Sequence, residues 1–406
     1  MTIIEGILDL QKYDFTDTSF DLLMQKRIHS VLVICSNYDN YMLEEDGRID
    51  EQIFNEYASL NLRYPPTFVQ TDNAEDAFRI LQDGNIDLVI SMLSLKGTDV
   101  FALAKRIKTK YENIPIVVLT YFSREVSLRL EGEDLSAIDY VFCWLGDASL
   151  ILAIIKLIED KMNADYDIEH IGVQAIILVE NSIRYISSYL PNIYRIVLLQ
   201  SLDFQREALN EHQRMLKMRG RPKILLANNF NDARDLYKKY KYNVLGVISD
   251  ISYKRDNITD ENAGIELCKV VMADDDKVPF LIQSSSTTHK KIAEELGAGF
   301  INKYSKSLSL ELRNFIIQNL AFGPFVFRNP VTLEPIAIAT DLQSLQQKLL
   351  TIPDNTLEYH ASRNHFSKWL NARALFPVAQ MFKYIRKEDF NTMDEMRRFL
   401  YVAISS

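Results

Sequence analysis

Short apolar runs alternate with amphipathic helical segments along most of this chain. The first series begins at Ser30 and consists of "VLVIC", "FVQTD", "IDLVISM", "IPIVVLT" and "IDYVFCW". Helical segments such as "AEDAFRILQDG" and "VFALAKRIKTKY" separate these runs. Continuous apolar strands between helices are typical of a parallel sheet that helices cover on both faces. Five such units in this order predict an α/β, flavodoxin-like, doubly wound (βα)5 domain.

The same order of elements recurs in the second half of the chain, where the strand-like runs are "AIILVE", "KILLANN", "VLGVISD", "VPFLIQSS" and "AGFINK". The 406 residues suffice for two to four domains. We therefore predict two tandem domains of one fold. The predicted order is an N-terminal arm (1–29), a first domain (30–165), a second domain with an extended first helix (170–322) and a small C-terminal α+β module (323–406). We expect this module to lead into a further domain.

The charge and cysteine content restrict the class of protein. The net charge of −9 argues against nucleic acid as the main partner, because phosphate binding needs clustered Lys and Arg. Three widely spaced cysteines, an odd number, suggest a reducing compartment without disulfides. The acidic start is unlike a signal peptide, and no apolar run approaches the ~20 residues of a membrane helix. We expect a cytoplasmic protein that binds no membrane.

Polar residues stand at the ends of four strands in the second domain. Glu180 and Asn181 end the first strand, Asp250 the third, Ser284 the fourth and Lys303 the fifth. In an open parallel sheet, ligands bind beyond the carboxyl ends of the strands. We therefore expect these side chains to meet in one pocket.

Their chemistry is that of phosphoryl transfer. The Asp250 carboxylate can act as a nucleophile that accepts a phosphoryl group. Glu180, Asn181 and Asp250 offer the oxygen ligands that Mg²⁺ prefers. The Lys303 ammonium can pair with phosphoryl oxygens, and the Ser284 hydroxyl can rotate to bind the group once it arrives.

This pattern resembles the receiver domain of response regulators, with "LVEN", "VISD", "IQS" and "AGFINK" as the matching segments. The resemblance implies Asp250 as phosphoacceptor, Ser284 and Phe300 as switch residues, and Lys303 as the phosphate-pairing residue. Two departures stand out. Receivers usually carry an acid at the position of Asn181, so its neutral amide should weaken Mg²⁺ binding, and a long "SYKRDNITDENAG" segment follows Asp250.

The first domain lacks this set of residues. On the same frame, Cys35 and Ser36 replace the acidic pair, Met92 replaces the phosphoacceptor, Thr120 keeps the switch hydroxyl and Cys143 replaces the lysine. Without a nucleophile, metal ligands or counter-charge, this domain resembles a pseudo-receiver. No basic residue adjoins Cys143 in sequence, which argues against a reactive thiol there.

The sequence of the C-terminal module shows a second resemblance. "FVFRNP" and "YHASRNHFSKWLNAR" are similar to segments of bacterial proteins with two receiver-like domains ahead of a pyruvate, phosphate dikinase-like, phosphoenolpyruvate/pyruvate-binding domain. The catalytic motifs of the dikinase itself are absent, which implies a regulatory region rather than an enzyme. His360 and His365 lie five residues apart, so on one helix they would occupy different faces, and we expect a structural or surface role for both.

Two functional hypotheses follow. The first is a phosphorelay module in which Asp250 takes a phosphoryl group from a histidine kinase or a small phosphodonor and regulates an attached or partner output domain. The alternative is a phosphorylation-independent scaffold in which both receiver folds serve as binding surfaces, which the amide of Asn181 favours. A homodimer is compatible with either hypothesis.

Overall fold

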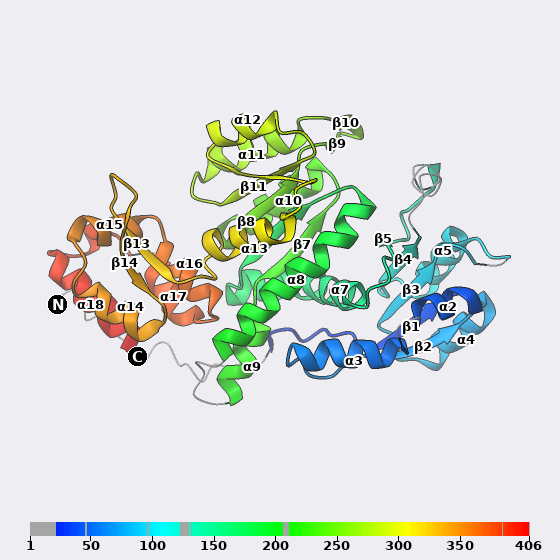
Figure 1. The fold of residues 1–406 in the computed structure, drawn as a ribbon. Coiled ribbons are helices and arrows are strands. Elements are labelled where there is room, and N and C mark those ends of the chain that lie inside the picture. The colour runs from blue at the N-terminus through cyan, green and yellow to red at the C-terminus, as the bar shows by residue number, and fades with distance from the viewer. Residues whose placement is uncertain are drawn as a thin grey trace. The chain divides into compact units, whose positions relative to one another are not determined.

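The structure is a computed structural model that describes residues 22–44, 47–95, 97–121, 130, 132–205, 211–383 and 385–405. The chain forms two compact units (Figure 1). The amino-terminal unit comprises Met24–Asn163 and Glu180–Leu202. The carboxy-terminal unit comprises Ala164–Val179 and Asp203–Ser406, together with Leu22 and Leu23.

The amino-terminal unit contains a five-stranded parallel sheet in the order β2-β1-β3-β4-β5. Its strands are β1 (Ser30–Ile34), β2 (Thr67–Thr71), β3 (Leu88–Met92), β4 (Ile116–Thr120) and β5 (Tyr140–Cys143). Its helices are α2 (Asn37–Leu43), α3 (Ile49–Ser59), α4 (Ala74–Asp83), α5 (Val100–Lys110) and most of α7 (Ser149–Tyr166).

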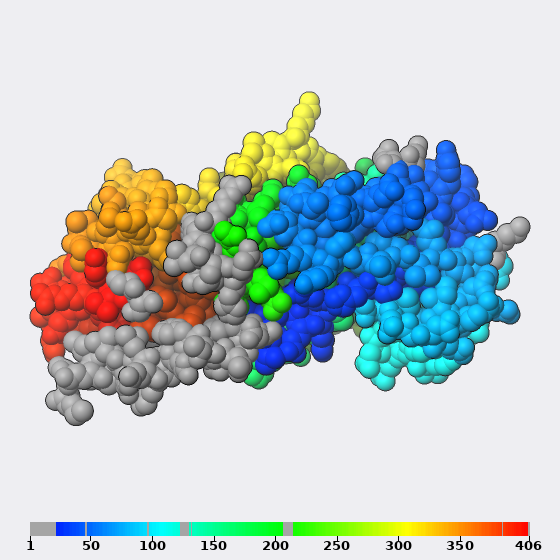
Figure 2. Space-filling model, turned by 90° about the horizontal axis from the view of Figure 1, so that it is seen from below, coloured from blue at the N-terminus to red at the C-terminus, as the bar shows by residue number. Residues whose placement is uncertain are grey.

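Burial and capping explain these elements. Every residue of β3 and β4 is buried, as expected for inner strands of a sheet covered on both faces. The apolar stripes of α4 and α5 share one core with β1, β3 and β4. The side chain of Asn73 caps α4 by accepting a hydrogen bond from the Asp76 amide, and Gly84 ends the helix at φ +85°. Helix α3, in medium blue, lies at the surface of this unit in Figure 2.

The carboxy-terminal unit contains a second five-stranded parallel sheet, in the order β7-β6-β8-β11-β12. Its strands are β6 (Ala175–Val179), β7 (Lys223–Ala227), β8 (Val244–Asp250), β11 (Phe280–Ser284) and β12 (Gly299–Asn302). Numbered within each sheet, both strand orders are 2-1-3-4-5, which is the flavodoxin-like order. The predicted fold class and the internal repeat are therefore confirmed.

The helices of this second repeat are α8 (Ile183–Gln205), α9 (Glu211–Arg219), α10 (Phe230–Tyr240), α11 (Ala263–Asp274), α12 (His289–Glu295) and α13 (Leu308–Asn319). A π-helical segment at Asp167–Ile171 and a 3₁₀ turn at Lys241–Asn243 complete it. Helix α8 follows β6 in the chain, but most of it belongs to the amino-terminal unit. The two compact units therefore do not coincide with the two sequence repeats, and the predicted domain limits remain a prediction.

The long segment after Asp250 forms a β-hairpin. Its strands are β9 (Tyr253–Arg255) and β10 (Ile258–Asp260), which pair antiparallel. Asp256 and Asn257 form the turn at positive φ, as two-residue hairpin turns require. Tyr253 is fully buried, and its hydroxyl lies 3.1 Å from the hydroxyl of Ser249. The hairpin is thus anchored beside the end of β8.

The C-terminal module, orange to red in Figures 1 and 2, has its own apolar core. Its elements are β13 (Phe325–Arg328), β14 (Pro335–Ala339), α14 (Leu342–Leu349), α15 (Asp354–Ser362), α16 (His365–Ala372), α17 (Phe376–Lys383), a 3₁₀ turn (Lys387–Asp389) and α18 (Met393–Ser405). Asn364 and Ala374, both at positive φ, separate α15, α16 and α17 from one another. No helix in the described part of the chain is long and apolar enough to cross a membrane.

Candidate functional site

Asp250 and Lys303 form a buried ion pair at the carboxyl edge of the second sheet. Asp250 is the last residue of β8, and Lys303 directly follows β12. Their strands are separated by β11, so the lysine side chain reaches across the end of that strand. Its Nζ lies 2.9 Å from Asp250 Oδ1, and both side chains are nearly inaccessible, at 4% and 11% exposure.

The two oxygens of the Asp250 carboxylate differ in their surroundings. Oδ1 is paired with the Lys303 ammonium and accepts a hydrogen bond of 2.8 Å from the Ile251 amide. Over the residues that the structure describes, no donor contacts Oδ2. A carboxylate that is oriented through one oxygen and open at the other is suited to nucleophilic attack by the open oxygen.

Ser284 belongs to the same network. It ends β11, is 1% exposed, and its carbonyl accepts a 2.9 Å hydrogen bond from the Lys303 amide. Its Oγ accepts the Ser286 amide at 3.1 Å and lies 2.9 Å from Nδ1 of His289, the first residue of α12. Sequence reasoning missed His289. The polar run "SSSTTH" after the strand was the available signal, but it does not show which side chain folds back.

Glu180 and Asn181 directly follow β6, whose last residue, Val179, pairs with Ser249 of β8. The register therefore brings the ends of β6 and β8 to the same edge of the sheet. Glu180 is 1% exposed and its Oε1 accepts the Ser182 amide at 2.9 Å, whereas Asn181 is exposed. Phe300 lies on β12, partly buried against the sheet core. Among the described residues, no group of three or more His, Cys, Asp or Glu is placed to hold a metal ion.

A glycine allows the close approach of α11 to the end of β8. A Cβ atom on Gly264 would lie 2.2 Å from the carbonyl oxygen of Asp250 and 2.9 Å from Cα of Ile251. These are backbone atoms, so they could not move aside without displacing Asp250. The sequence shows this glycine but not the contact that requires it.

The corresponding edge of the first sheet is filled by packed side chains. Met92 ends β3 at 2% exposure, and Cys35 and Cys143 are 3% and 0% exposed. Thr120 turns its hydroxyl onto the Tyr121 carbonyl at 3.1 Å, and the Cys143 amide donates to Ser187 Oγ at 2.7 Å. The site residues predicted for the first repeat thus line one edge, but packing replaces the polar network of the second repeat.

One carboxylate at this edge was not anticipated. Ser36 caps α2, and its hydroxyl donates to Asp39, a residue that is 4% exposed. Burial, followed by the charges of Asp39, Glu44 and Asp72, raises the pKa of the Cys35 thiol to about 12. Cys35 is therefore a neutral, unreactive thiol at physiological pH.

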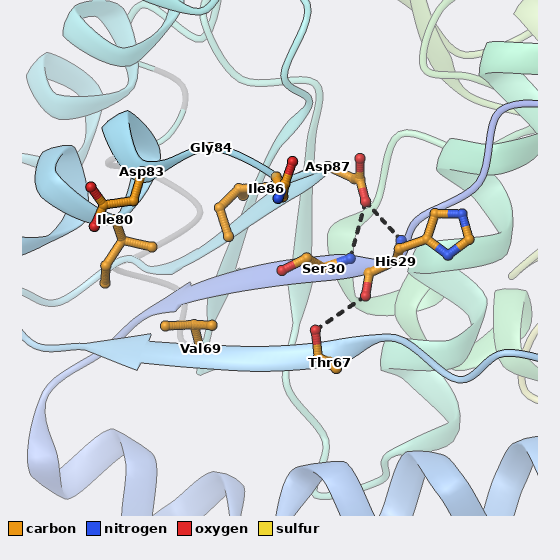
Figure 3. A pocket seen from close by; sticks show the side chains of 10 residues that line it. His29, Ser30, Thr67, Val69, Ile80, Asp83, Gly84, Ile86 and Asp87 are labelled. Atoms are coloured by element: carbon orange, nitrogen blue, oxygen red, sulfur yellow. Dashed lines mark hydrogen bonds between the residues drawn. The ribbon is translucent and has the colours of Figure 1, made fainter.

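A hollow of about 560 Å³ lies at the opposite, amino end of the first sheet (Figure 3). Figure 3 shows the Asp87 carboxylate bonded to the backbone amides of His29 and Ser30, at 2.8 and 3.0 Å. Thr67 donates to the His29 carbonyl at 3.3 Å. These bonds fix the starts of three neighbouring strands, so the polar groups of this hollow hold the sheet together.

His360 and His365 contact each other, which corrects the expectation of different helix faces. Helix α15 ends at Ser362 and α16 begins at His365, because Asn364 takes a left-handed conformation. The two Nδ1 atoms are 2.9 Å apart, and His360 Nε2 accepts the Arg328 amide at 2.9 Å. His360 must therefore carry its proton on Nδ1 and donate it to His365. Burial lowers the pKa of His360 to about 3 and that of His365 to about 4.

Comparisons with known proteins give fold neighbours at low similarity. No protein-family profile and no curated protein matches the chain. Among solved structures, the signal receiver domain of an HD domain-containing protein from Pseudomonas fluorescens Pf-5 is 19% identical, covers 34% of this chain and 93% of its own, and has a TM-score of 0.25. The phosphorylated cyanobacterial phytochrome response regulator RcpA is also 19% identical, with coverages of 33% and 93% and a TM-score of 0.25.

A third neighbour is longer. A putative two-component system response regulator/GGDEF domain protein is 14% identical, covers 72% of this chain and 98% of its own, and has a TM-score of 0.31. The flavodoxin-like fold of both repeats follows from the strand order and connectivity described above, not from these scores.

Proposed function

We propose that the second repeat is a phosphoacceptor domain of a phosphorelay and that Asp250 is its acceptor. The observation that carries this proposal is the buried Asp250–Lys303 pair, which within the described part of the chain leaves Oδ2 of the carboxylate without a donor. The open oxygen attacks the phosphorus of a histidine kinase phosphohistidine or a small acyl phosphate. The bond from phosphorus to the donor breaks, and the donor leaves with the electron pair. Lys303 then pairs with a phosphoryl oxygen.

Magnesium is the proposed cofactor. The carboxylates of Asp250 and Glu180 and the amide oxygen of Asn181 are hard oxygen donors that fit Mg²⁺, which also retains several waters. When bound, Mg²⁺ would neutralise charge on the incoming phosphoryl group. The protein's own contribution is to orient Asp250 through Ile251 and Lys303.

The consequence of phosphorylation is proposed to be regulatory rather than catalytic. The new charge biases a two-state element, with Ser284 and Phe300 as the switch residues. The output is an attached or partner domain in the cytoplasm. The proposal that this output domain is pyruvate, phosphate dikinase-like rests only on the sequence resemblance of the segments "FVFRNP" and "YHASRNHFSKWLNAR".

The alternative is a phosphorylation-independent scaffold. The packed edge around Met92 favours this function for the first repeat, and Asn181 favours it for the second. The two proposals differ in whether Asp250 accepts a phosphoryl group or its analogue.

Acetyl phosphate with Mg²⁺, followed by mass spectrometric mapping, tests the phosphoacceptor. We expect one phosphoryl adduct, on Asp250, and none in Asp250→Asn. Lys303→Ala should slow labelling strongly, while Lys306→Ala, an exposed lysine nearby, should not. Label that persists in Asp250→Asn would refute the assignment, and a protein that takes neither phosphate nor beryllofluoride would favour the scaffold.

Substitution of Asn181 tests the metal site. Asn181→Asp should tighten Mg²⁺ binding, because one more carboxylate joins the shell of the cation. Asn228→Asp, at the end of the neighbouring strand β7, is the matched control. Equal Mg²⁺ affinities for the parent and Asn181→Asp, measured by titration calorimetry, would place Asn181 outside the site.

A further inference from the structure

The hydroxyl of Ser284 already has a partner before any phosphoryl group is present. Ser284 Oγ lies 2.9 Å from His289 Nδ1 and accepts the Ser286 amide at 3.1 Å. A hydroxyl has one proton and two lone pairs. The amide of Ser286 occupies one lone pair, so the contact with His289 uses either the proton or the second lone pair.

The other contacts of the Ser284 hydroxyl show whether it donates to His289 Nδ1 or accepts from it. Ser284 is 1% exposed, and a buried hydroxyl proton needs an acceptor. Across the described ranges, His289 Nδ1 is the one acceptor that the Ser284 hydroxyl reaches. The serine therefore donates to Nδ1, and the neutral imidazole carries its proton on Nε2.

A phosphoryl group on Asp250 would offer acceptors only, so Ser284 can bind it only by donating the same proton. We propose that His289 is a positioning residue that latches Ser284 in the unphosphorylated state. His289 and the phosphoryl group then compete for the proton of the Ser284 hydroxyl. The bond to His289 therefore opposes the movement of Ser284 toward a phosphoryl group on Asp250. This inference rests on the proposed phosphoacceptor function and adds to it a residue on α12.

The place of the latch supports a regulatory role. The Ser284 carbonyl accepts the amide of Lys303, whose ammonium holds Asp250. The latch therefore joins α12 to the strand end that is bonded to the phosphate-pairing lysine. Release of Ser284 frees the first residue of α12, a helix that is short and otherwise mostly exposed.

Beryllofluoride binding with Mg²⁺, measured by calorimetry, tests the latch in a double-mutant cycle. His289→Ala should bind beryllofluoride roughly 2- to 10-fold more tightly than the parent, the range for loss of one competing hydrogen bond. In the Ser284→Ala background, His289→Ala should have no effect. Lys290→Ala, the exposed neighbour on α12, is the control and should match the parent.

Unchanged or weaker binding by His289→Ala, or an equal change with and without Ser284, would overturn the latch. If even the parent fails to bind beryllofluoride, the phosphoacceptor proposal fails. In that case, nitrogen-15 NMR of the His289 ring, recorded without any phosphate analogue, tests the Ser284–His289 hydrogen bond separately from phosphorylation. We expect the Nε2-protonated form in the parent and a changed tautomer balance in Ser284→Ala, whereas identical spectra would refute the hydrogen bond.

Discussion

At the scale of single residues, the two repeats carry chemically different side chains at the same strand end, an aspartate in the second repeat and a methionine in the first. The burial of the Asp250 carboxylate is compensated at Oδ1, where the Lys303 ammonium and the Ile251 amide contact it. Met92 stands at the equivalent strand end and needs no partner. An unbranched methionine can adapt to the space between neighbouring strands, which explains the closed edge of the first sheet.

Met92→Asp should therefore destabilise the amino-terminal unit without creating a phosphorylation site. The new carboxylate would stand beside Cys35, whose surroundings already include Asp39, Glu44 and Asp72. We expect a loss of about 2–4 kcal/mol in the free energy of unfolding at neutral pH. Burial raises the pKa of the folded-state acid, so the loss should begin near pH 4 and grow as pH rises.

Thermal denaturation between pH 4 and 8, with Met92→Leu as the volume-matched control, measures this loss. A Met92→Asp protein as stable as Met92→Leu that also accepts phosphate from acetyl phosphate would show that the first edge kept a working pocket.

The His360–His365 pair makes the C-terminal module sensitive to acid. Both folded-state pKa values lie below the usual value of 6.5, so the unfolded chain takes up protons first as pH falls. The free energy of unfolding keeps its full value above pH 6.5 and declines below this pH, by roughly 2 kcal/mol per histidine at pH 5. We expect the melting temperature to drop between pH 7 and 5.

The double variant His360→Gln/His365→Leu should flatten this pH dependence, measured as the difference in melting temperature between pH 7 and 5. His170→Gln removes an exposed histidine and should keep the slope of the parent. A parent slope that the double variant leaves unchanged would show that other groups cause the acid sensitivity.

At the scale of elements, the site depends on how closely α11 approaches β8. Gly264→Ala would place a methyl group 2.2 Å from the Asp250 carbonyl oxygen. We expect a loss of about 1–3 kcal/mol in unfolding free energy and slower labelling of Asp250, because the backbone must shift. Gly132→Ala has nothing within 4 Å and should stay within about 1 kcal/mol of the parent. Urea denaturation compares both, and equal stability of the two variants would contradict the packing described here.

At the scale of the whole molecule, Arg373 joins the C-terminal module to the end of the second repeat. The residue is 2% exposed and follows α16. Its guanidinium donates to the carbonyls of Ala321 and Gly323 at 3.1 Å each and lies 3.5 Å from the centre of the Trp369 ring. These contacts require the planar guanidinium group of arginine, since the ammonium group of a lysine cannot stack on a ring and donate to two carbonyls at the same time.

Arg373→Lys should therefore loosen the connection at Ala321–Gly323. We expect about 2–4 kcal/mol lower stability and faster amide hydrogen exchange in this segment and in α16. Arg398→Lys, on an exposed face of α18, should exchange like the parent. Parent-like exchange in Arg373→Lys would show that other contacts hold the module.

The sequence by itself determined the fold of both repeats, because apolar strands and amphipathic helices have different periods that can be read locally. It also placed Asp250, Ser284 and Lys303 at one edge, since parallel strands bring their carboxyl ends together. Their roles in phosphorylation remain predictions.

Contacts distant in sequence were decided only by the tertiary structure. The His289 side chain folds back onto Ser284, Gly264 packs on the Asp250 carbonyl, and a left-handed Asn364 turns two histidines toward each other. Backbone direction at a single residue and the packing of a neighbouring helix set these contacts. A one-dimensional pattern records neither, which is why the predicted helix across His360 and His365 was wrong while the sheets were right.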